Sequence, residues 1–111
     1  MNKIIITDEA IETTILNATL SVDGVLDSWK GMEEYIPYFN RDKKHPHGID
    51  FILEKDVIKV NIFVTVAYGA DLRKVGKEIQ DKVKAQIENM TPYKLSTIVV
   101  FIEDIKYEEQ E

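Results

Sequence analysis

Apolar and polar residues alternate along three stretches of the chain, and such alternation is typical of strands with one buried face. The clearest stretch covers residues 58–66, and similar patterns occupy residues 49–54 and 95–105. The apolar face of the clearest stretch consists of Ile58, Val60, Ile62, Val64 and Val66. A short apolar run at residues 3–6 predicts one further strand near the beginning of the sequence.

Two other segments place apolar residues three or four positions apart, which is the repeat of a helix with one buried face. The first helix is predicted to begin at Thr7-Asp8, where either side chain can act as N-cap, and to end at Gly24. The second follows Asp71 and ends at Thr91-Pro92, because proline cannot continue a helix. Inside a helix glycine costs about 1 kcal/mol relative to alanine, so Gly76 predicts close packing against the sheet.

The resulting order is β-α-β-β-α-β, with a long connection after the first helix. It predicts an α+β fold with two layers, in which a small, mostly antiparallel sheet carries the helices packed on one face. The length of 111 residues fits a single domain, residues 1–111. Residues 26–48 have no regular pattern and are expected to form an irregular aromatic and charged loop, and residues 107–111 to form a frayed tail.

Composition and charge exclude several classes of protein. A hydrophobic content of 44% is too high for a disordered chain, and the lack of cysteine excludes disulfide frameworks and thiolate metal sites. The net charge of −6 argues against a broad nucleic-acid footprint and against direct attraction to an anionic membrane surface. The longest uncharged stretch, residues 60–70, is too short to span a membrane, so no direct membrane insertion is expected. The sequence therefore predicts a cytoplasmic protein.

Candidate chemical sites are weak, and we predict no catalytic, cofactor-binding or metal-binding residues and no small-molecule substrate. His45 and His47 form the only histidine pair, whereas a stable metal site needs three or four ligands. The segment 68–71 joins a strand to a helix N-terminus, where anions can bind. A capping and packing role is favoured there, because the Asp71 carboxylate would repel a phosphate.

An aromatic group in the irregular segment is the candidate partner-binding surface. It consists of Trp29, Tyr35, Tyr38 and Phe39. Two interpretations stay open, since these side chains can form a lid over the hydrophobic core or an exposed surface that binds a protein partner. The second interpretation rests on the enrichment of aromatic residues in protein interfaces.

Several segments, in their order and spacing, resemble the alkaline shock protein family of Gram-positive bacteria. These are residues 4–11 (IIITDEAI), 22–25 (VDGV), 60–69 (VNIFVTVAYG), 71–91 and 98–105 (IVVFIEDI). The sequence departs from the family pattern in two places. Pro92 follows Thr91 where the family usually has glycine, and the segment after Gly24 is aromatic and charged where the family is commonly glycine-rich and aliphatic.

The resemblance implies a non-enzymatic cytosolic protein that is linked to cell-envelope homeostasis and stress. Such a protein would act by self-association, forming a homo-oligomer, or by binding a membrane-anchored protein that brings it to the membrane. The alternative is a small RNA-binding module, since α+β domains of similar element order bind RNA. This alternative lacks a basic face and a Gly-X-X-Gly clamp in the sequence, so nucleic acid is the less favoured partner.

Overall fold

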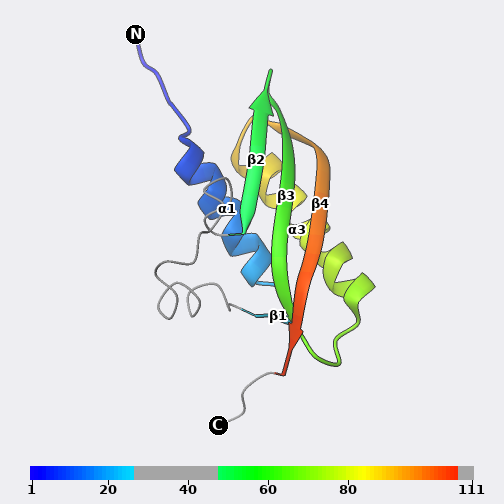
Figure 1. Cartoon of the computed structure of the whole chain (residues 1–111). Helices are drawn as coiled ribbons and strands as arrows, with labels where there is room; N and C mark the ends of the chain where they lie inside the picture. Colours follow the sequence, from blue (N-terminus) through cyan, green and yellow to red (C-terminus); the bar gives the residue numbers. More distant parts are fainter. Residues whose placement is uncertain (27–47, 108–111) are drawn as a thin grey trace, which may run out of the picture.

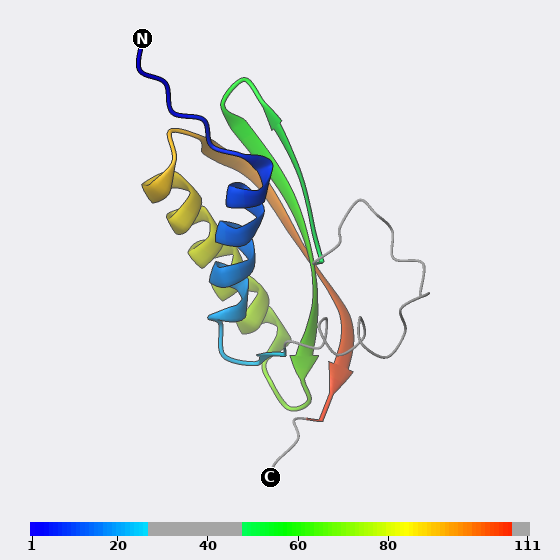
Figure 2. The same ribbon diagram turned by 90° about the vertical axis from the view of Figure 1, so that its left-hand side faces the viewer.

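A computed structural model describes residues 1–26 and 48–107. The described residues form a two-layer α+β fold, as predicted, with both helices on the same face of one sheet (Figures 1 and 2). The elements in chain order are α1 (Asp8–Leu20), β1 (Val25–Leu26), β2 (Ile49–Glu54), β3 (Val57–Ala67), α3 (Leu72–Met90) and β4 (Lys94–Lys106).

Strand β3 is the centre of the sheet and pairs with each of the other strands. β4 runs parallel to β3 along its whole length, whereas β1 and β2 are antiparallel to it. β1 and β2 therefore share the other side of β3, where β2 pairs with residues 57–62 and β1 with residues 65–66. The mostly antiparallel sheet is confirmed in two of these three pairings. The third is a parallel β3-α3-β4 unit, in which the helix crosses over the sheet.

The core lies between the helices and the sheet. All five members of the predicted apolar face of β3 are buried. Three residues of α3 that follow the helical repeat, Ile79, Val83 and Ile87, have no exposed surface. Burying a side chain of this size contributes about 1.5–3 kcal/mol, so the periodic residues that predicted the elements also hold the two layers together.

The structure selects Thr7 from the two N-cap candidates of α1, and Asp71 caps α3. The Thr7 hydroxyl accepts a hydrogen bond from the amide of Ala10 at 3.2 Å, and a carboxylate oxygen of Asp71 accepts one from the amide of Lys74 at 3.2 Å. Each bond satisfies one of the amides that the first turn of a helix leaves without a partner. The capping role predicted for residues 68–71 is therefore correct.

The predicted strand at residues 3–6 is wrong. These residues have no strand partner in the described structure, and Ile4 and Ile5 are 92% and 70% exposed. An apolar run forms a strand only where another strand supplies hydrogen bonds, and no strand of the described residues lies alongside residues 3–6 to supply them. Leu26, expected in the irregular loop, instead belongs to β1 and pairs with Thr65.

Two glycine predictions need correction. α1 ends at Leu20 with Ser21 as C-cap, and Gly24 lies in the turn that leads into β1, with φ of +95°. A Cβ added to Gly24 would approach Cγ2 of Val75 to 3.2 Å, so glycine suits this turn on both counts. A Cβ added to Gly76, in contrast, would meet no atom within 4 Å. Close packing therefore does not explain the glycine at position 76.

Candidate interaction surface

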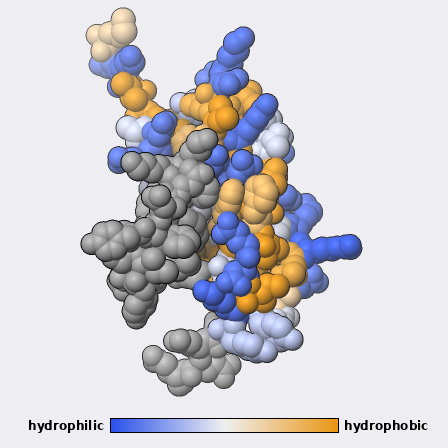
Figure 3. All heavy atoms as spheres, viewed as in Figure 1, coloured by the Kyte–Doolittle hydropathy of each residue, from blue (hydrophilic) through white to orange (hydrophobic). Residues whose placement is uncertain are grey.

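The face of the sheet opposite the helices carries a group of apolar side chains. We call this face the outer face, and its apolar members include Ile52, Phe63, Val99 and Phe101. The register places them together, because Val99 pairs with Asn61 and Phe101 pairs with Phe63 across β3 and β4. Figure 3 looks onto this face and shows apolar side chains gathered over β3 and β4 with hydrophilic ones around them.

An aromatic pair lies within this group. The rings of Phe63 and Phe101 have their centroids 4.7 Å apart with an interplanar angle of 31°. Phe101 remains 45% exposed, Val99 39% and Ile52 57%. Phenylalanine rings bury a large area when a partner covers them, so an exposed ring within a group of apolar side chains is typical of a contact surface.

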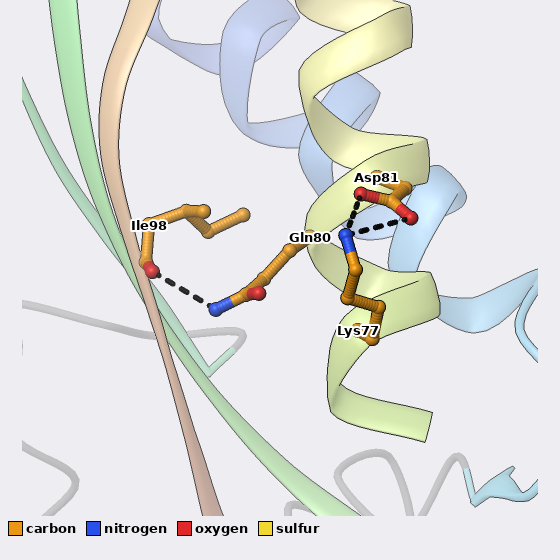
Figure 4. Close-up of polar contacts among 4 residues, drawn as sticks. All are labelled: Lys77, Gln80, Asp81 and Ile98. Carbon is orange, nitrogen blue, oxygen red and sulfur yellow. Dashed lines mark hydrogen bonds and ion pairs between the residues drawn. The ribbon is translucent and has the colours of Figure 1, made fainter. Parts of the chain in front are cut away.

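The second feature of the surface is the open edge, by which we mean the side of β4 that faces away from β3. No strand of the described residues pairs with it. Side chains of α3 reach its first half, where the Glu88 carboxylate accepts a hydrogen bond from the amide of Leu95 at 3.0 Å. The amide of Gln80 donates to the carbonyl of Ile98 at 3.2 Å (Figure 4).

Beyond Ile98, no side chain of another described element bonds to the backbone of β4. Two β-bulges bound the regular part of the strand, because Ser96 and Glu103 have no partner in the register with β3. Bulges and covering side chains are common protections of strand edges. Among the described residues they leave 99–102 as a short stretch of regular edge that no side chain of another element covers.

A groove of about 590 Å³ lies between α1 and α3 on the far side of the helix layer. Small and polar side chains line it, among them Thr13, Asn17 and Ala85. Lys82 is the ionisable group of its lining, and its ammonium donates to the Ser21 carbonyl at 3.2 Å. This bond links α3 to the end of α1, so the lysine has a structural role. Acid–base catalysis generally uses two titratable groups in unlike environments.

The aromatic residues selected from the sequence, Trp29, Tyr35, Tyr38 and Phe39, lie outside the described residues, as do His45 and His47. Their partner-binding role stays a prediction. In the described ranges no group of three or more His, Cys, Asp or Glu side chains is placed to hold a metal ion.

Sequence reasoning missed the Phe63–Phe101 pair and the open edge of β4. The signal was present, because Phe63 and Phe101 both lie opposite the apolar face of their strands. Recognising it required the parallel pairing of two strands that are separated by a whole helix.

The helices of the described residues are all too short or too polar to cross a membrane. Among solved structures, the fold is similar to that of a histidine-to-alanine variant of MamM-CTD, with a TM-score of 0.59 and 13% identity over 88% of this chain and 98% of that chain. A nickel form of an aspartate-to-asparagine variant of MamM CTD gives a TM-score of 0.56 and 14% identity, covering 91% and 99% of the two chains. At this identity the likeness concerns the fold alone.

Two comparisons concern the sequence. The protein YqhY of Bacillus subtilis (strain 168) is 24% identical over 108 residues, which cover 97% of this chain and 80% of YqhY. The model of the Asp23 family, where Asp23 is the name of the family, matches residues 1–107 and is described by a cell envelope-related function. The chain therefore belongs to this family, the alkaline shock protein family that its motifs resemble.

Proposed function

We propose that this protein acts without catalysis, as an interaction protein of the cell envelope that self-associates or binds a membrane-anchored partner. The observation that carries the proposal is the outer face, where the exposed ring of Phe101 packs on Phe63 beside the open edge of β4. Membership of a family with a cell envelope-related function supplies the cellular setting.

The geometry suits binding by contact. An open strand edge offers backbone hydrogen bonds to any extended segment, and the side chains beside the edge decide which segment fits. Phe101 and Val99 project from the edge strand itself, so a segment that pairs with β4 also touches the apolar group of the outer face. Hydrogen bonding and apolar contact therefore act on the same partner.

The lining of the α1–α3 groove supports the non-enzymatic part of the proposal. A catalytic cleft brings titratable groups into unlike environments so that one can act as acid and another as base. The groove has Lys82 as its ionisable group, bonded to the carbonyl of Ser21 at the end of α1, with hydroxyl, amide and apolar side chains around it.

The proposal can be tested with Phe101→Glu, which places a charge in the aromatic pair. Full-length tagged protein is expressed at native level beside an untagged copy, and co-isolation and membrane fractionation are measured. We expect the wild-type protein to retain the untagged copy or to sediment with membranes, and Phe101→Glu to lose both properties. Lys84→Glu, on an exposed position of α3, is the matched control and should behave as wild type.

Two results would contradict this function. One is a wild-type protein that neither retains its untagged copy nor enters the membrane fraction. The other is a Phe101→Glu variant that associates as well as the wild type.

One observation favours RNA binding as a second candidate function. Aromatic rings on an open sheet face are the platform on which several RNA-binding modules stack bases. The register places Lys59 on this face, but it also places Asp50 and Asp104 there, and these carboxylates repel phosphates. A salt-dependent gel shift with single-stranded RNA, abolished by Phe101→Ala, would favour this function over protein contact.

A further inference from the structure

The first residues of the chain form an arm that projects away from the body of the molecule (Figures 1 and 2). We define the arm as residues 2–6. Its side chains Ile4 and Ile5 are 92% and 70% exposed, whereas Ile6 packs against the core and anchors the end of the arm. Isoleucine favours strands, so the arm is suited to pairing in a sheet. Among the described residues of its own chain it has no strand partner.

The open edge of β4 has backbone amides and carbonyls that no strand of the described residues pairs with. Residues two apart in a regular strand direct their backbone groups to the same side. The Ile98 carbonyl points away from β3 toward Gln80, so the amides and carbonyls of Val100 and Ile102 point outward as well. These groups lie on the part of the edge that no side chain of another described element covers.

Charge selects the direction in which the arm would pair. In an antiparallel arrangement, Lys3 lies beside the acidic end of β4, at Glu103 and Asp104, and the isoleucines lie along its uncharged part. In a parallel arrangement, Asp8 and Glu9 would follow the isoleucines into that same acidic end. Opposite charges across two strands stabilise a pairing and like charges destabilise it, so the antiparallel arrangement is favoured.

We propose that the arm of one copy adds as an antiparallel strand to the open edge of β4 in a second copy of this chain. The inference rests on the self-association named above and assigns the segments that carry it. It accounts together for an apolar run that is exposed and for an edge that has no strand partner in the described structure.

The positions of the two segments determine the kind of assembly. The arm leaves the molecule beside α1 and β2, whereas the open edge of β4 lies on the opposite side of the sheet (Figure 1). Each copy therefore contributes two different surfaces, and such head-to-tail contacts extend into open chains unless the rotation closes a ring. Four paired residues span only about 13 Å, so the interface is small and association depends strongly on concentration.

The first test measures oligomer size by sedimentation velocity of the full chain, from low micromolar to millimolar concentration. The wild type should form a series of growing species, and the double variant Ile4→Asp/Ile5→Asp should need at least about tenfold more protein to associate, a loss of about 1.4 kcal/mol. Met90→Asp is the control, because this apolar side chain is 62% exposed at the end of α3, outside the arm, the open edge and the outer face. Ile4 and Ile5 are exposed, so the double variant should keep the wild-type melting temperature.

The second test reverses the charges. Lys3→Glu and the pair Glu103→Lys/Asp104→Lys should each weaken association, and a chain that carries all three changes should recover it. Failure of this recovery, with both single sets weakened, would overturn the antiparallel pairing.

The outcomes separate the two proposals. If the wild type associates and the Ile4→Asp/Ile5→Asp variant associates equally well, the arm is not the connecting segment, while self-association stands. If the wild type stays monomeric at every concentration, self-association fails and the arm pairing fails with it.

Discussion

The two faces of the sheet differ in burial although both carry apolar side chains. Ile62 of β3, on the helix-covered face, is 1% exposed, whereas Ile52 of β2, on the outer face, is 57% exposed. The covered face is explained by folding, because α1 and α3 pack on it. The apolar groups of the outer face stabilise the folded chain much less. Apolar residues on one face of this sheet hold the two layers together, and those on the other face are the ones to which we assign contact with a partner.

Truncating an isoleucine on each face tests whether the difference in burial is also a difference in stability. Ile62→Ala should lower the free energy of unfolding by about 2–5 kcal/mol, because it leaves a cavity in the core. Ile52→Ala should lower it by less than about 1 kcal/mol, since its side chain is already half in water. Urea unfolding of both variants measures the difference, and equal losses would show that the outer face is also part of the folded core.

The attachment of the helix layer can be weakened at its caps. Asp71→Ala removes the acceptor for the amide of Lys74 and should cost about 0.5–2 kcal/mol, whereas Asp71→Asn, which keeps an acceptor oxygen, should cost less. Thermal unfolding monitored by circular dichroism gives both values. A neutral Asp71→Ala variant would mean that the packing of α3 alone fixes where this helix begins.

Gly76 allows the opposite change. A methyl group at this position meets no atom within 4 Å, so Gly76→Ala should raise the free energy of unfolding by about 0.5–1 kcal/mol through the better helix propensity of alanine. The same unfolding measurement checks the gain. A loss of stability would indicate that the backbone of α3 needs glycine at this point, and would restore the packing interpretation.

The smallest expected effect concerns the exposed ion pair of α3. The Lys77 ammonium lies 3.0 Å from the Asp81 carboxylate, four residues further along the helix (Figure 4). Lys77→Ala should therefore change the free energy of unfolding by only about 0.3–0.5 kcal/mol. A loss larger than that of Asp71→Ala would show that surface charge, and not capping, sets the stability of this helix.

The local pattern of apolar and capping residues was sufficient to predict much of the fold. The period of β3, the helical repeat of α3 and the caps Thr7 and Asp71 depend on neighbours within a few positions, and the structure confirms them. The strand predicted at residues 3–6 failed because a strand needs a partner, and the chain supplies none at that place in the described residues.

The candidate surface was harder to predict than the fold. Sequence reasoning selected Trp29 and its aromatic neighbours because aromatic residues are enriched in interfaces. It passed over Phe63 and Phe101 because they lie opposite the predicted core faces of their strands. Their contact depends on β3 and β4 pairing in parallel across the length of α3, which is a long-range property. The bonds of Gln80 and Glu88 to the edge of β4 depend on the same arrangement.

Amide hydrogen exchange of the full chain at low and at high protein concentration tests most directly whether the open edge of β4 contacts a second copy. The account predicts that the outward amides of Val100 and Ile102 become more protected as concentration rises, while amides of β2 keep the same exchange rates. Exchange rates on β4 that do not change with concentration would contradict it.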